Sequence, residues 1–285
     1  MLRVCNWPIE PQRPVDRIAI AQIHLQLVTQ PEPGIHMSEA SMPSRRTMLR
    51  TAAGAGLLAG CGRSPRTVPE GDQPVTNLTL PPLTRERRDQ LTPDQFLAFA
   101  KEGNQRFREG AMITRDYRGE QRATASGQYP GGVVLGCIDS RAPAEILFNF
   151  GIGDLFNARV AGNVVNPDIL GSMEFATALS GAMLVVVMGH TGCAAVKGAI
   201  AGAKLGNLTG LLARLEPAVA ATTFDGEKSA DNMAYVDAVA RKNAELTVGN
   251  VREQSKVMAD LEQAGRLRIV GAMYDVSSGA VEFLT

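Results

Sequence analysis

The chain has 285 residues, of which 45% are hydrophobic and 20% are charged, a composition typical of a globular protein with a sizeable buried core. Its 29 lysines and arginines balance its 29 aspartates and glutamates, so no overall positive charge points to nucleic acid as a partner. Four cysteines in a chain of this length are too few for a fold that depends on disulfides.

Residues 1–61 are predicted to be an N-terminal extension that contains an export signal. Arg45-Arg46 precede a short apolar run, residues 52–59, and small residues then lead to Cys61. The apolar run is too short to span a bilayer, which takes roughly 20 residues. The arginine pair resembles a twin-arginine signal, and residues 58–61, LAGC, resemble a bacterial lipobox. We therefore expect a bacterial protein exported to the periplasm, or anchored on the outer side of the inner membrane by a lipid on Cys61.

Two points about this region stay open. Residues 1–36 do not suit a signal peptide, so a start at Met37 or Met42 would give a more ordinary signal. The alternative to an export signal is a short amphipathic segment behind a wrongly assigned start. Residues 62–90 are rich in proline, threonine and charge and have no apolar period, which predicts a flexible linker to a domain over residues 91–285.

The domain is predicted to start with a helix from Pro93 to about Arg108. Thr92 and Gln95 form a capping box before this helix, and proline stands at its first position. Apolar runs beyond it predict strands over 131–136, 154–160 and 182–188, with a closing hairpin over 266–284. Helical patterns cover 168–181, 193–204, 207–220, 231–248 and 250–264. This alternation predicts an α/β fold with a mostly parallel central sheet flanked by helices.

Two of the predicted central strands end in side chains that bind metals. Cys137 follows the first of these strands, and His190 and Cys193 follow the other. Because the carboxyl ends of parallel strands meet at one edge of a sheet, we expect the three side chains at one point. Two thiolates and an imidazole are typical ligands of Zn²⁺. His190 is the only histidine in the predicted domain.

These segments resemble the β-carbonic anhydrase family over about residues 90–285. The resemblance lies in CIDSR at 137–141, GDLFNARVAGN at 153–163, GHTGC at 189–193, NVREQS at 250–255 and YDVSSGAV from Tyr274. It implies one Zn²⁺ per subunit, bound by Cys137, His190 and Cys193. It also implies reversible hydration of CO₂ to bicarbonate, by a water that the metal activates. Family members are homodimers or multiples of dimers, with active sites at the subunit interface.

The resemblance also implies roles for five further residues. Arg141 would hold Asp139 beside the metal, where Asp139 accepts a hydrogen bond from the reacting water. Released from Arg141, Asp139 would become the fourth metal ligand of a closed state. Gln128, Phe156 and Phe175 stand at positions that contact substrate in the family.

Other interpretations of these residues stay open. Cys137 and Cys193 could be plain buried thiols or a disulfide, and Asp139 with Arg141 an ordinary ion pair. Phe156 and Phe175 could be core residues, and Gln128 a solvated loop residue. Phe175 replaces a family tyrosine, and Ala194-Ala195 replace Gly-Gly. A zinc-binding module with little turnover is therefore one alternative function, and a CS₂ or COS hydrolase on the same scaffold is another.

Overall fold

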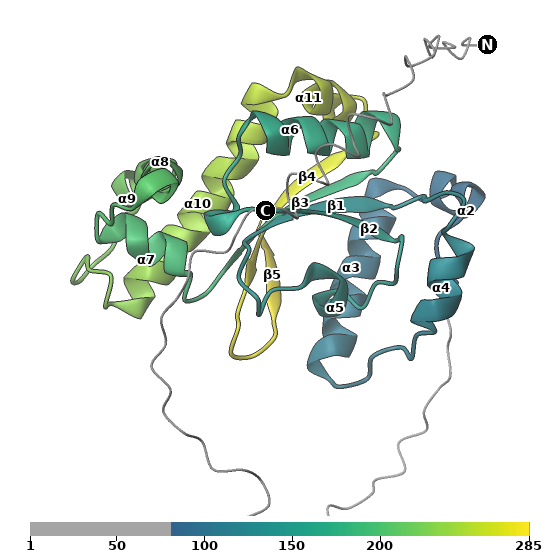
Figure 1. Cartoon of the computed structure of the whole chain (residues 1–285), viewed down its shortest axis with the longest axis horizontal. Helices are drawn as coiled ribbons and strands as arrows, with labels where there is room; N and C mark the ends of the chain where they lie inside the picture. The colour runs from purple at the N-terminus through teal and green to yellow at the C-terminus, as the bar shows by residue number, and fades with distance from the viewer. Residues whose placement is uncertain (1–80, 285) are drawn as a thin grey trace, which may run out of the picture. The chain divides into compact units, whose positions relative to one another are not determined.

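The computed structural model describes residues 81–284, and this part of the chain forms a sheet with helices on both faces (Figure 1). The strand order is β2-β1-β3-β4-β5. The first four strands in this order are parallel, and β5 runs antiparallel to β4. The strands are β1 Gly132–Gly136, β2 Leu155–Arg159, β3 Leu184–His190, β4 Arg268–Tyr274 and β5 Val281–Leu284. The predicted α/β fold with a mostly parallel central sheet is confirmed.

The helices of the described part lie mostly between successive strands. They are α2 Arg85–Asp89, α3 Pro93–Arg108, α4 Tyr117–Ala123, α5 Ala144–Leu147, α6 Pro167–Glu174, α7 Ala194–Ile200, α8 Gly206–Ala213, α9 Glu216–Ala221, α10 Met233–Gln254 and α11 Lys256–Gln263. A 3₁₀ turn, η1, covers Ala161–Asn163, and a π-helical turn, η2, covers Phe175–Leu179. No helix within residues 81–284 has the length and hydropathy that crossing a membrane requires.

Each face of the sheet has its own apolar core. Side chains alternate between the two faces along a strand, so the neighbours Val133 and Val134 enter different cores. Val134 packs with residues of α3 and α5, which lie below the sheet in Figure 1. Val133 packs with residues of α6, α10 and α11, which lie above it. Burial on both faces explains why β1 and β3 are continuous apolar runs.

The start of α3 has the predicted geometry. The Oγ1 of Thr92 accepts the N–H of Gln95 at 3.2 Å, and the side chain of Gln95 accepts the N–H of Thr92 at 2.9 Å. Each bond satisfies a backbone donor that the first helical turn would otherwise leave free. The capping box and its helix, Pro93–Arg108, are therefore confirmed.

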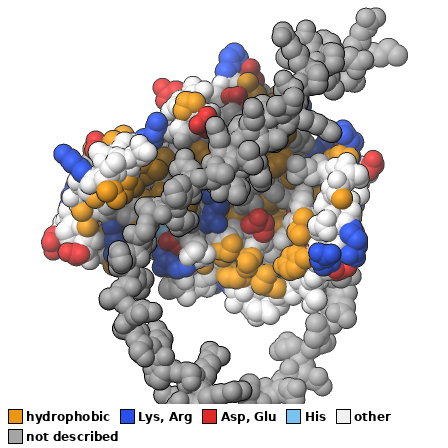
Figure 2. Space-filling view, in the orientation of Figure 1, with side chains coloured by type: hydrophobic (Ala, Val, Ile, Leu, Met, Phe, Trp, Pro, Cys, Tyr) orange, Lys and Arg blue, Asp and Glu red, His pale blue; other side chains and the backbone are white. Residues whose placement is uncertain are grey.

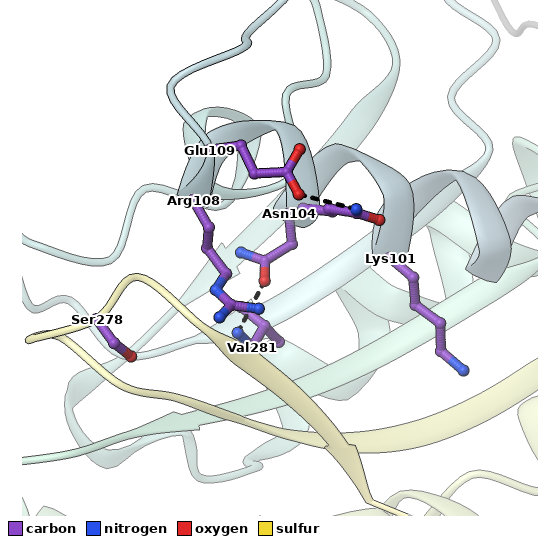
Figure 3. A pocket seen from close by; sticks show the side chains of 7 residues that line it. Lys101, Asn104, Arg108, Glu109, Ser278 and Val281 are labelled. Atoms are coloured by element: carbon purple, nitrogen blue, oxygen red, sulfur yellow. Dashed lines mark hydrogen bonds between the residues drawn. The ribbon is translucent and has the colours of Figure 1, made fainter.

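Asn104 of α3 holds the β4–β5 hairpin against the helix (Figure 3). Its amide nitrogen donates to the carbonyls of Gly279 at 2.9 Å and Leu147 at 3.1 Å. Its amide oxygen accepts the N–H of Val281 at 2.9 Å. This one buried side chain therefore satisfies three backbone groups and sets the position of the closing strand.

The structure corrects two of the predicted helices. The predicted helix 207–220 is two helices, because Pro217 lacks an N–H and its ring clashes with the carbonyl one turn earlier. The predicted break between 231–248 and 250–264 lies instead at Ser255. There the side chain of Ser255 accepts the N–H of Met258 at 3.2 Å and caps α11.

Three short helices lie where no helix was predicted. Two of them are α4 and α5, and the third is α2, which forms inside the predicted linker 62–90 with Thr84 as its N-cap. Arg88 of α2 is buried and donates a hydrogen bond to the carbonyl of Ser180. The end of the predicted linker is thus packed on the domain, while residues 62–80 and the predicted export signal lie outside the described residues.

Candidate metal centre

Three predicted ligands lie together at the carboxyl edge of the sheet. Cys137 directly follows β1, His190 is the last residue of β3, and Cys193 is the residue before α7. β1 and β3 are adjacent parallel strands, so their ends meet. The ligand atoms of the three residues all lie within 4.8 Å of one another. All three side chains are buried, and both cysteines are free thiols.

His190 has a lone pair that no described residue uses. Its Nδ1 lies 2.9 Å from the carbonyl oxygen of Thr191, which can only accept, so Nδ1 carries the hydrogen. The other ring nitrogen, Nε2, is then an acceptor, and it is buried without a hydrogen-bond partner. A buried polar atom without a partner is costly. A metal ion between His190 and the two sulfurs would use this lone pair, and the donor set suits Zn²⁺.

The two thiols interact strongly. The hydrogen bond with Cys193 is the main cause that holds the pKa of Cys137 well below its ordinary value. The N–H of Gly162 also donates to the Cys137 sulfur at 3.3 Å and stabilises its charge. The same contact with Cys137 is the main cause that raises the pKa of Cys193, and burial of this thiol is the second cause. A divalent ion beside the two sulfurs would favour the thiolate form of both.

Asp139 is held beside this cluster by Arg141. The Nε and Nη2 atoms of Arg141 donate to the two carboxylate oxygens at 2.9 and 2.7 Å, and its backbone N–H donates at 3.0 Å. These contacts hold the pKa of Asp139 well below its usual range, so the carboxylate stays charged. Its Oδ2 lies 3.9 Å from Nε2 of His190. Asp139 is thus an oriented hydrogen-bond acceptor next to the candidate ligand atoms.

A family model described as carbonic anhydrase matches residues 132–281, which include Cys137, Asp139, His190 and Cys193. The chain belongs to the β-carbonic anhydrase family. It is 36% identical over 181 residues to carbonic anhydrase 2 of Mycobacterium tuberculosis, covering 63% of this chain and 86% of that relative.

Solved β-carbonic anhydrases share the fold. The structure of one from Aspergillus fumigatus has 25% identity and a TM-score of 0.51, and the match covers 67% of this chain and 89% of that one. A tetrameric β-carbonic anhydrase of Sordaria macrospora has 22% identity and the same TM-score of 0.51, over 67% of this chain and 92% of that one.

In this β-carbonic anhydrase domain, Arg159 contributes a contact that the sequence did not predict. Arg159 is the last residue of β2, which lies beside β1. Its Nε donates to the carbonyl of Cys137 at 2.8 Å, and its Nη2 donates to the carbonyl of Asp139 at 2.6 Å. The loop after β1 is therefore held from the neighbouring strand. Only the pairing of β1 with β2 brings these residues together, so spacing along the chain gave no sign of it.

The predicted substrate-contacting residues lie elsewhere within one chain. The rings of Phe156 and Phe175 meet edge to face with centroids 6.2 Å apart, and both line a cavity of about 600 Å³ beside α6. Phe156 pairs with Val133, near the end of β1 that is opposite Cys137. Gln128 is exposed in the loop before β1. A single chain does not bring these three residues to the Cys-His-Cys cluster, and their role stays a prediction.

Proposed function

We propose that the protein catalyses the reversible hydration of CO₂ to bicarbonate and a proton, with one Zn²⁺ per subunit held by Cys137, His190 and Cys193. The buried cluster of two thiols and one imidazole, whose Nε2 has no hydrogen-bond partner among residues 81–284, carries this proposal. Three protein ligands leave one position of a tetrahedral zinc ion open to water. Membership of the β-carbonic anhydrase family supports the same reaction.

Zinc in this site would supply a Lewis acid that lowers the pKa of coordinated water to about 7. The chain's own residues would orient the imidazole ligand and supply a charged hydrogen-bond acceptor. The carbonyl of Thr191 fixes the tautomer of His190, so that Nε2 keeps a lone pair that a metal ion could use. Asp139, charged and held by Arg141, would accept a hydrogen bond from the attacking water and so direct the lone pair of that water toward CO₂.

We also propose that a second copy of the chain completes the CO₂ pocket with Phe156 and Phe175. Phe175 is 51% exposed, and its neighbour Leu179 is 78% exposed. Figure 2 shows a separate group of hydrophobic side chains on the surface below the middle of the view, around the place of α5 in Figure 1 and across the sheet from α6. Exposed apolar surface of this kind is typical of a protein interface. The tetrameric state of the Sordaria macrospora enzymes supports assembly from several copies.

A hydration assay tests the proposed reaction. Stopped-flow measurement on the zinc-loaded chain should show CO₂ hydration well above the buffer rate between about pH 7 and 9, around the pKa expected for zinc-activated water. Bound zinc without turnover would instead support a zinc-binding module. Faster turnover of CS₂ or COS than of CO₂ would support a hydrolase on this scaffold.

We further propose that residues 44–64 direct export and that Cys61 is lipidated, which the arginine pair and the LAGC sequence support. Replacing Arg45 and Arg46 by lysine should keep the protein in the cytoplasm of a bacterium that has the twin-arginine route. Cys61→Ser should release the protein from the membrane fraction. A wild-type protein found only in the cytoplasm would contradict export.

A further inference from the structure

Helix α10 contacts two turns at the candidate metal centre, the turn between His190 and Cys193 and the turn η1, which faces the sulfur of Cys137. Oδ1 of Asp237 accepts the N–H of Gly192, which lies between His190 and Cys193, at 2.8 Å. Further along the same helix, the amide nitrogen of Asn243 donates to the carbonyl of Gly162 at 2.8 Å. The N–H of Gly162 in turn donates to the sulfur of Cys137 at 3.3 Å.

In both turns, a glycine has a backbone conformation that this residue adopts easily and can also leave easily. Gly162 has a φ of 72° and Gly192 a φ of 63°, in the left-handed region. Without an external contact, little in the glycine backbone itself would keep these turns in one conformation. A hydrogen bond from a rigid helix to each turn supplies that contact.

Apolar packing holds helix α10 in place independently of these hydrogen bonds. Tyr235, Val236, Val239 and Ala240 of α10 are buried in the same cluster as Cys137 and Cys193. Asn243 is only 3% exposed, and Gly162 is buried, so the hydrogen bond between them has no access to bulk water. Losing Asn243 would leave the Gly162 carbonyl without a partner and free the turn that faces the Cys137 sulfur.

We propose that Asp237 and Asn243 are positioning residues that fix the two glycine turns and thereby set the geometry of the metal ligands. Asp237 acts on the turn of His190 and Cys193, and Asn243 acts through Gly162 on Cys137. This inference rests on the proposed zinc site. In other proteins, removing a hydrogen bond that orients a metal ligand weakens metal binding by about 10- to 100-fold.

Zinc affinity of the full chain, measured by competition with a chromophoric chelator, tests the proposal. Asp237→Ala and Asn243→Ala should each weaken binding by about 10- to 100-fold. Asp237→Asn keeps an oxygen that can accept the Gly192 N–H, so it should restore most of the affinity lost in the alanine variant. If Asn243→Ala does not fold, Asn243→Ser, whose side chain is too short to reach Gly162, replaces it.

Two control variants remove similar hydrogen bonds at other places. Asn104→Ala removes a buried asparagine that bonds three backbone groups, of which Figure 3 draws the one at Val281. Asp116→Ala removes a carboxylate that accepts the N–H of Gly119 at 2.9 Å. Both should lower the melting temperature of the metal-free protein and leave zinc affinity unchanged.

A second readout separates positioning from general stability. Bound zinc raises the melting temperature by an amount that grows with the logarithm of its affinity for the folded chain. The rise caused by zinc should therefore be smaller in Asp237→Ala and Asn243→Ala than in the wild type and the controls. Affinities equal to those of the controls would overturn this inference alone. A wild-type chain that binds no zinc would overturn both the inference and the proposed function.

Discussion

The imidazole of His190 is restricted to one tautomer because its Nδ1 faces a backbone carbonyl, which no substitution of Thr191 removes. Asp139 is restricted in the same way by three hydrogen bonds from Arg141. Neither side chain has to reorganise when substrate arrives, which is the condition for electrostatic catalysis.

Cys193→Ser replaces a thiolate by a hydroxyl, which is a much weaker zinc ligand. We expect the purified variant to lose its zinc and its CO₂ hydration activity together. Metal analysis by mass spectrometry and stopped-flow kinetics measure the two effects. Retained zinc with full activity would show that Cys193 is not a ligand.

Asp139→Asn removes a charged acceptor and leaves all three ligands in place. The variant should keep its zinc, while kcat/KM for CO₂ hydration should fall by about 100-fold. Because Arg141 holds the pKa of Asp139 below its usual range, the carboxylate is charged at every pH near neutrality. The loss should therefore be the same at each pH in that range. An unchanged rate would remove the proposed role of Asp139.

At this scale, the sequence was sufficient to predict that residues next to strand ends lie close together. Cys137, Asp139 and Arg141 follow β1 directly, so their closeness needed no tertiary information. Arg159 and Asp237 could not be predicted, because only the pairing of β1 with β2 and the packing of α10 bring them to the site.

At the scale of elements, every strand of the sheet was predicted, and β1 and β3 had the clearest pattern because both are buried along their whole length. Helix ends were less predictable. Gly249 lies inside α10 even though glycine disfavours helix, because Val248 and Val251 on either side are buried against the core. The π-helical turn η2 was also missed, since nothing in the periodicity of 168–181 distinguishes it from α-helix.

The turn between β4 and β5 should give a measurable pH effect. Hydrogen bonds from Ser278 and Ser277 lower the pKa of Asp275 to about 2. A carboxyl whose pKa is lowered by folding stabilises the folded state above its unfolded pKa, near 4, and loses this contribution as the pH falls toward the folded value. Urea unfolding should show Asp275→Asn less stable than wild type near neutral pH. That difference should shrink from about pH 4 toward pH 2, and a constant difference would contradict this account.

At the scale of the whole molecule, the sequence predicted the fold and the metal-binding edge, and only the family resemblance pointed to an assembly. A single chain leaves Phe156 and Phe175 at the end of the strands opposite the ligands, and the surface nearby is apolar. These facts fit a site completed by a second copy, which no pattern within one chain could reveal.

Leu179→Glu tests this assembly. Leu179 is 78% exposed beside Phe175, so a charge there should separate the subunits, and CO₂ hydration should fall while zinc is retained. Leu205→Glu is the matched control, because Leu205 is 72% exposed in the segment between α7 and α8. Analytical ultracentrifugation measures the masses. A monomeric wild type, or an oligomeric Leu179→Glu variant with full activity, would be inconsistent with the proposed pocket.

The coordination of the metal itself is the most direct test of the whole account. X-ray absorption at the zinc edge of the purified protein should show two sulfur ligands at about 2.3 Å and nitrogen or oxygen ligands at about 2.0–2.1 Å. Cys193→Ser, if any zinc remains bound, should lose one of the two sulfurs. A zinc spectrum with only nitrogen and oxygen ligands would contradict a centre built from Cys137, His190 and Cys193.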